Sequence, residues 1–121
     1  MKNFYICAGS KLIAKRRYFR MVIITKGTIH AFAKKHPNAL IPLNEWYDKS
    51  KEAHWRKFSE VKLTFNSAGS IGSDRYVFDI GGNNFRIIAM IHFNIRTVYI
   101  RAILTHPEYD FLNKANRLTG L

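Results

Sequence analysis

The clearest pattern in the chain is the alternation of apolar residues with other residues across positions 74–110. Three strand-like runs follow one another there, at residues 75–80, 85–93 and 97–104. They are rich in β-branched and aromatic residues, and the joins between them are short, the first being Gly-Gly-Asn-Asn. Short joins connect antiparallel neighbours, so the pattern predicts an antiparallel sheet.

Residues two apart along a strand share a face, which allows the register to be predicted. Each run has one apolar set at this spacing: Tyr76, Phe78 and Ile80; Phe85, Ile87, Ala89, Ile91 and Phe93; Val98, Ile100, Ala102 and Leu104. If these sets face the core, Ile80 pairs with Phe85 in the first hairpin. In the second hairpin Phe93 then pairs with Val98. The predicted core side of the sheet is centred on Phe78, Ile87 and Leu104.

The opposite face of the predicted sheet is basic. The side chains expected there are Arg75, Arg86, Arg101, His92 and Tyr99. In this register Asp79 lies opposite Arg86, Arg86 opposite Thr105, and His92 opposite Tyr99. A single strand arginine is usually solvated or part of a cross-strand ion pair, and Asp79–Arg86 fits that description. Three arginines beside a helix that begins at a histidine instead favour an anion-binding surface.

Helices are predicted before and after this sheet. A short strand at residues 21–24 precedes a helix that begins at Thr25 or Thr28 and ends before Pro37. A second helix is expected at 38–53, with Pro42 in its first turn, and a short third one after a cap at Ser59. Residues 66–73 have the composition of a loop. The last helix is expected at 106–118, with Thr105 as its cap and with Phe111 and Leu112 buried.

Composition limits the class of protein. A chain of 121 residues is long enough for one domain that buries roughly two-thirds of its unfolded surface without disulfides. Its apolar runs are too short to span a membrane. The single cysteine, Cys7, fits a reducing compartment and is expected to be a passive apolar residue.

The net charge of +12 favours a polyanionic partner, chiefly nucleic acid or an anionic membrane. Six of the twenty basic residues lie within residues 1–20, where there is no acidic residue. This segment is interpreted as an extension before a domain at 21–121. We expect a flexible tail, or sequence translated ahead of a natural start at Met21, rather than a nucleic-acid-binding arm.

The sequence offers few familiar sites. The five histidines lack a zinc-ligand spacing, so no metal and no other cofactor is expected. There is no P-loop, no nucleophile elbow and no carboxylate pair. RNA can be cut without a metal when its 2′-hydroxyl attacks the adjacent phosphate, given an acid, a base and cations. Arg86 and Arg101 suit the cation role and His106 suits proton transfer, whereas Tyr109 and Asp110 are weaker candidates. Alternatively, His106 simply begins the helix and Tyr109 packs.

Several motifs in order resemble the HigB family of bacterial toxins, within the RelE-like superfamily. They are YVFDIGGNNFRIIAMIHF, VYIRAILTHPEYD and, earlier, KKHP and AHWRKFSEVKLTF. The resemblance implies an α+β fold with N-terminal helices packed on a small antiparallel sheet and a short C-terminal helix. It also implies a ribosome-dependent endoribonuclease that cleaves mRNA in the A site and acts in the bacterial cytoplasm, away from membranes.

The resemblance also assigns partners and site residues. The expected partner is a HigA-type helix-turn-helix antitoxin, through which alone the toxin would contact DNA. The positions matching catalytic motifs are Arg86, Arg101, His106, Tyr109 and Asp110. The candidates for RNA binding are Lys57, Lys62, Arg75, His92 and Tyr99. Two departures affect the site: Asp79 stands where the motif commonly has asparagine, and Phe111 where many members have lysine.

Two other functions fit the same residues. The arginines would only grip phosphates in a non-catalytic RNA- or ribosome-binding module. In a regulatory protein, the basic face would instead receive an acidic segment of a partner.

Overall fold

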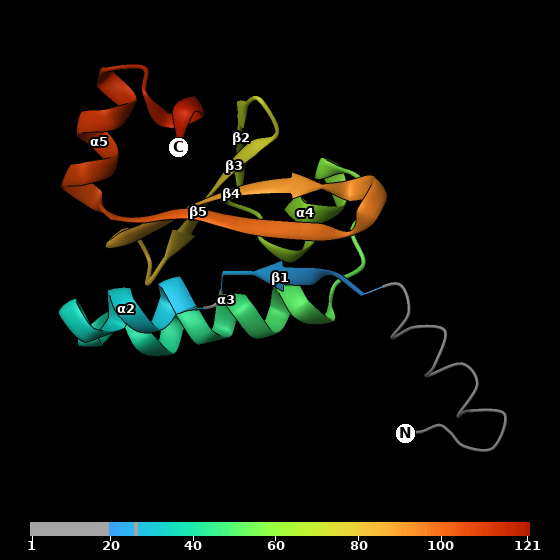
Figure 1. Ribbon diagram of the computed structural model, residues 1–121, viewed down its shortest axis with the longest axis horizontal. Helices are drawn as coiled ribbons and strands as arrows, with labels where there is room; N and C mark the ends of the chain where they lie inside the picture. The colour runs from blue at the N-terminus through green and yellow to red at the C-terminus, as the bar shows by residue number, and fades with distance from the viewer. Residues whose placement is uncertain (1–19, 26) are drawn as a thin grey trace, which may run out of the picture.

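The computed structural model describes residues 20–25 and 27–121, and a mixed sheet lies at the centre of this part of the chain (Figure 1). Its strands are β1 (Val22–Ile24), β2 (Gly69–Gly72), β3 (Arg75–Ile80), β4 (Phe85–His92) and β5 (Thr97–Thr105). They are arranged in the order β1-β5-β4-β3-β2. β1 runs parallel to β5, and the remaining neighbours are antiparallel. The predicted α+β class is confirmed.

Helices lie on both sides of the sheet. They are α2 (Gly27–Lys35), α3 (Leu40–Glu52), α4 (Phe58–Thr64) and α5 (His106–Lys114), with short 3-10 turns η1 (Pro37–Ala39), η2 (Phe93–Ile95) and η3 (Leu118–Gly120). In Figure 1, α2 and α3 run beneath β1, whereas α5 lies on the other side of the sheet. Pro42 falls in the first turn of α3, as predicted, where a missing N–H costs nothing.

Several element boundaries differ from the sequence-based prediction. Ser59 was expected to cap the third helix but lies inside α4, whose N-cap is Lys57. Residues 66–73 were expected to form a loop, but four of them form β2, an edge strand that pairs with β3. Its glycines and serine have low strand propensity, so pairing with a neighbour decides its conformation. The last helix ends at Lys114 and not at residue 118, and η3 follows it.

The larger apolar cluster lies between the sheet and helices α2, α3 and α4. Trp46 and Phe78 are almost fully buried there and meet edge to face, with ring centroids 5.4 Å apart. Phe65 makes a similar contact with Phe78, also at 5.4 Å. Trp55 is buried and Phe58 is half-buried, so both attach α4 to this core, as expected.

The register of the first hairpin is confirmed, and that of the second is wrong. Asp79 pairs with Arg86 and Ile80 with Phe85, as predicted. In the second hairpin, however, Arg86 pairs with Leu104 instead of Thr105. His92 likewise pairs with Thr97 and not with Tyr99.

The difference has a local cause. The turn after β4 is the 3-10 turn η2, which ends at Arg96 in the left-handed conformation (φ 51°). A bulge then changes the register between Ile88 and Ala89, where Ala102 and Ile100 are the partners and Arg101 has none. One extra residue exchanges the two faces of a strand, so Leu104 lies on the face opposite the main core.

A second apolar cluster therefore covers the face that was expected to be open. Its buried members are Val77, Ile88 and Leu118, and its half-buried members are Ile71, Ala102, Leu104, Tyr109, Leu112 and Leu121. They come from the sheet, α5 and the segment around η3. Phe111 was expected to be buried but is 67% exposed, because α5 turns Tyr109 and Leu112 toward the sheet.

The interpretation of residues 1–20 as an extension concerns mainly residues 1–19, which lie outside the described part of the chain. Arg20 forms an ion pair with Glu52 on α3, at 2.9 Å. Within the described residues, no helix is long and apolar enough to cross a membrane.

Candidate active site

The turn between β3 and β4 lies against the start of α5. The backbone N–H of His106 donates to the carbonyl oxygen of Asn84 at 3.0 Å, which ties the two segments together. Gly81 and Gly82 have positive φ angles of 61° and 69°, a conformation that glycine adopts without steric cost. This turn therefore depends on its Gly-Gly pair, and it fixes where α5 begins.

A capping box sets the direction of α5. The Thr105 hydroxyl accepts from the backbone N–H of Glu108 at 3.4 Å, and the Glu108 carboxylate accepts from the N–H of Thr105 at 2.9 Å. Pro107 occupies the first turn, where its fixed φ suits a helix. His106 is consequently the first helical residue, held at the end of β5.

Arg86 is buried beneath this junction, and protein atoms surround its guanidinium. Nε lies 3.1 Å from the carboxylate of Asp79. Nη1 donates to the carbonyl oxygens of Asn83 and Phe85 at 3.2 and 3.1 Å. Nη2 donates to Oδ1 of Asn83 and faces Nδ1 of His106 at 3.4 Å. An arginine has five N–H bonds, and these contacts engage all of them.

The contacts of His106 determine which of its nitrogens carries the proton. A guanidinium only donates, so Nδ1 of His106 must accept from Arg86. In the neutral ring the proton then lies on Nε2, which is 3.3 Å from Oδ2 of Asp110. Since the side chains of His106 and Asp110 are 43% and 49% exposed, this proton lies at the surface.

Tyr109 completes the cluster. Its ring lies below the guanidinium carbon of Arg86, which is 5.3 Å from the ring centroid, a cation–π distance. The ring is half-buried and belongs to the second apolar cluster. The structure thus brings together four of the five expected residues, Arg86, His106, Tyr109 and Asp110, which together form the His106 cluster.

Arg101 makes its contact with the C-terminal residue and not with the His106 cluster. Its Nε donates to the carbonyl oxygen of Leu121 at 3.0 Å, and Arg75 donates to the same oxygen at 2.9 Å. We expected Arg86 and Arg101 to share an open face near His106. Instead Arg86 is buried, and Arg101, the bulged residue of β5, contacts the C-terminal segment.

The expected RNA-binding residues do not form one patch with the His106 cluster. His92 and Tyr99 contact each other near the other end of the β4–β5 hairpin, with ring centroids 5.5 Å apart. Lys57 is exposed at the start of α4, whereas Lys62 donates to the carbonyl oxygens of Asn66 and Ala68. Arg75 is half-buried at Leu121.

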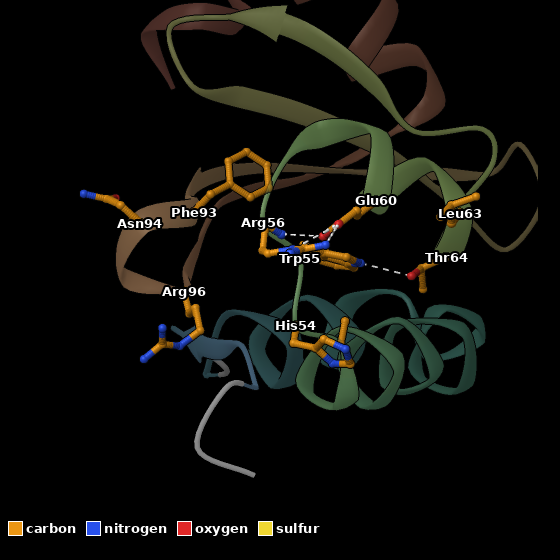
Figure 2. A pocket seen from close by; sticks show the side chains of 10 residues that line it. His54, Trp55, Arg56, Glu60, Leu63, Thr64, Phe93, Asn94 and Arg96 are labelled. Atoms are coloured by element: carbon orange, nitrogen blue, oxygen red, sulfur yellow. Dashed lines mark hydrogen bonds and ion pairs between the residues drawn. The ribbon is translucent and has the colours of Figure 1, made fainter. Parts of the chain in front are cut away.

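Sequence reasoning missed two features. Asn83, interpreted only as a turn residue, holds Arg86 with its side chain and its backbone, and an asparagine three residues before an arginine was the available signal. A groove of about 1150 Å³ also lies away from the His106 cluster, around Trp55, Leu63 and Phe93 (Figure 2). Among the described residues, no three His, Cys, Asp or Glu side chains are grouped so as to hold a metal ion.

This fold and cluster agree with comparisons to known proteins. A family model described as HigB_toxin, the RelE-like toxic component of a toxin–antitoxin system, matches residues 39–112, more than half of the chain. The "mRNA interferase toxin HigB" of Escherichia coli K12 is 31% identical over 102 residues, covering 83% of this chain and 98% of that protein. The "mRNA interferase HigB" of Escherichia coli O6:H1 is 33% identical over 99 residues, covering 80% and 96%.

These matches define first a class, the RelE-like toxins of toxin–antitoxin systems. Within that class, the chain belongs to the HigB family.

Proposed function

We propose that this protein is a ribosome-dependent endoribonuclease that cleaves mRNA in the A site and so inhibits translation. The observation that carries the proposal is the chain of contacts from the buried Arg86 through His106 to Asp110. The side chains of His106 and Asp110 are partly exposed. Its relatives are named mRNA interferases, which supports the same substrate class here.

The reaction uses the chemistry of RNA itself. The 2′-hydroxyl gives its proton to solvent water and attacks the adjacent phosphorus, and the bond from phosphorus to the 5′-oxygen breaks, which leaves a 2′,3′-cyclic phosphate. A proton must then reach the leaving 5′-oxygen. In the step we propose, His106 donates from the exposed Nε2 as an imidazolium: Nδ1 has taken up a proton, and Arg86 has exchanged this acceptor for the phosphate.

The remaining residues of the cluster act mainly through His106. Arg86 orients the ring and leaves its positive charge beside the site, where negative charge develops on the phosphorane. It would contact a phosphate directly only after giving up one of its present acceptors. Tyr109 holds the guanidinium from one side, and Asp110 accepts from Nε2 until the substrate replaces it. Arg101 would bind phosphate after release from Leu121.

The biological setting follows from the family. A toxin of a toxin–antitoxin pair requires an antitoxin, and we propose one of the HigA helix-turn-helix type. Its site of action would be the bacterial cytoplasm, where ribosomes and mRNA are found. DNA would be bound only through the antitoxin complex.

Induction in bacteria tests the activity. The full chain, His106→Ala and the control His30→Ala are induced, and the 5′ ends of mRNA are mapped. His30 is exposed on α2, far along the chain from the cluster. The wild type and His30→Ala should arrest growth and create cut ends within reading frames. His106→Ala should lose about 10²-fold or more of this cutting, since acid–base catalysis contributes about that much.

Two results would contradict the proposal. One is that the wild type creates no new ends, and the other is that His106→Ala cuts as well as the wild type. A block of translation without cut ends would instead support a non-catalytic ribosome-binding module.

A further inference from the structure

The groove of about 1150 Å³ is separate from the His106 cluster (Figure 2). Its walls are the segment between α3 and α4, helix α4 itself, and the turn η2 that follows β4. Arg86 lies near the opposite end of β4 from Phe93, and a strand rises about 3.3 Å per residue. The groove therefore shares no residue with the candidate active site and has no role in the chemistry proposed above.

The floor of the groove is apolar. Trp55 is only 3% exposed, and its indole N–H donates to the hydroxyl of Thr64 at 3.0 Å. Phe93 is half-buried and packs edge to face on Tyr76, with ring centroids 5.9 Å apart. These side chains are fixed before any ligand arrives, so the groove is preformed.

An exposed aliphatic side chain lies on one wall. Leu63 is 86% exposed although it lines the groove, and Ile95, beside the lining residues Asn94 and Arg96, is 54% exposed. Exposed aliphatic surface beside a preformed apolar floor is typical of a surface that binds another protein.

The rim is mainly basic. Arg56 has a side chain that is 85% exposed, and Glu60 holds it through contacts of 3.2 and 2.9 Å to its Nε and Nη2. The same contacts, with the Arg56 backbone N–H, keep the pKa of Glu60 below its ordinary value, so this carboxylate stays charged at neutral pH. Arg96 and His54 also line the groove (Figure 2).

These features favour a peptide over RNA. Bases stack on accessible aromatic faces, but Trp55 is buried and offers no open face. An apolar side chain needs no open ring face, because it can pack on the exposed Leu63, and carboxylates beside it can reach the cations of the rim.

We propose that this groove binds an acidic, amphipathic segment of the antitoxin. An apolar side chain of that segment packs against Leu63, and its carboxylates pair with Arg56 and Arg96. The net charge of +12 makes an acidic partner complementary to the whole chain. The inference rests on the toxin–antitoxin pairing given above, but not on RNA cleavage.

The test compares two exposed aliphatic residues, one in the groove and one outside it. Leu63→Asp places a carboxylate in the groove, whereas the control Ile41→Asp places one on α3, at a position that is 71% exposed and outside the groove. Both variants are made in the full chain carrying His106→Ala, to prevent toxicity. The probe is the purified antitoxin encoded beside the toxin gene, and calorimetry measures its Kd.

We expect Leu63→Asp to weaken binding about tenfold or more, as for a central interface residue, and Ile41→Asp to change it by less than about twofold. Arg56→Gln should weaken binding and also reduce its dependence on salt. Thermal melting confirms that each variant folds. On binding, hydrogen exchange should slow in residues 54–64 and 93–96.

Equal affinities for Leu63→Asp and Ile41→Asp would overturn the proposal. Loss of ribosome binding in Leu63→Asp with unchanged antitoxin affinity would assign the groove to the ribosome instead. Sedimentation of the chain alone as a dimer that Leu63→Asp dissociates would assign it to a second copy. None of these readouts depends on RNA cleavage, so failure of the proposed enzymatic activity would leave the result interpretable.

Discussion

Arg86 on β4 donates to Nδ1 of His106 on α5 across 3.4 Å, so a buried guanidinium fixes the tautomer of a surface histidine. The contact joins two segments twenty residues apart in sequence. Asp79 and Asn83 hold Arg86 from the other side, which makes the position of the histidine a consequence of the β3–β4 hairpin. The carboxylate at residue 79, where the family motif commonly has asparagine, is part of this support.

Asp110→Asn should slow mRNA cleavage by about tenfold, less than His106→Ala, because Asp110 acts through His106. Asparagine can still accept a hydrogen bond from Nε2, but it lacks the negative charge beside the ring. Cleavage of mRNA on purified ribosomes, followed by primer extension, measures the rate. The control is Asp48→Asn, an exposed position on α3. Equal rates for Asp110→Asn and the wild type would remove Asp110 from the mechanism.

Thr105→Ala should lower the free energy of unfolding by about 1 kcal/mol, the usual cost of losing an N-cap. The substitution removes the hydroxyl that accepts from the N–H of Glu108. Thr105→Ser keeps that hydroxyl and should remain within about 0.5 kcal/mol of the wild type. Urea denaturation of the three proteins measures the difference. If alanine and serine have the same effect, the capping box does not stabilise α5.

The sheet could be predicted because alternating apolar residues mark each strand. The β3–β4 hairpin follows directly from that pattern, including the pairing of Asp79 with Arg86. The register of the second hairpin could not be predicted. Ile87 and Ile88 are both fully buried although they point to opposite faces, so apolar character at the centre of β4 does not distinguish the two faces. The bulge at Arg101 then depends on tertiary packing, because β5 contributes side chains to both apolar clusters.

Part of the candidate site could be predicted because it lies next to the predicted strands. His106 follows β5 directly, so even a register wrong by one residue places it near Arg86. The surroundings of Arg101 depend on Leu121, twenty residues away, and no local pattern indicates that contact. The groove likewise combines residues near 55 with residues near 95, which only the tertiary fold brings together.

Leu118→Ala should lower the free energy of unfolding by about 2–3 kcal/mol, as expected for a leucine truncated in a core. Leu118 is 4% exposed and is buried against the sheet face that carries Val77 and Ile88. Leu63→Ala, at a position 86% exposed, is the matched control and should change stability by no more than about 0.5 kcal/mol. Chemical denaturation provides the comparison. A loss below about 0.5 kcal/mol for Leu118→Ala would mean that the second cluster adds little to stability.

Tyr76 should make the fold sensitive to alkali. Burial, and to a smaller extent the charge of Asp74, raises the pKa of Tyr76 above its ordinary value of 10.0. Below that pH both the folded and the unfolded chain keep the proton, so Tyr76 adds no pH dependence. Above it the unfolded chain loses the proton first, and stability falls until the pH passes the folded pKa. Tyr76→Phe keeps the ring contact with Phe58, at 5.2 Å, and removes the ionisable group.

Urea denaturation at a series of pH values from neutral to strongly alkaline tests this prediction. Near neutral pH, Tyr76→Phe should have a free energy of unfolding within about 1 kcal/mol of the wild type, the usual scale for one hydroxyl. As the pH rises above 10.0, the stability of the variant should fall less than that of the wild type. Tyr99→Phe is the control, because this half-buried side chain also carries a hydroxyl. An identical loss of stability in Tyr76→Phe and the wild type would show that ionisation of Tyr76 does not contribute to alkaline unfolding.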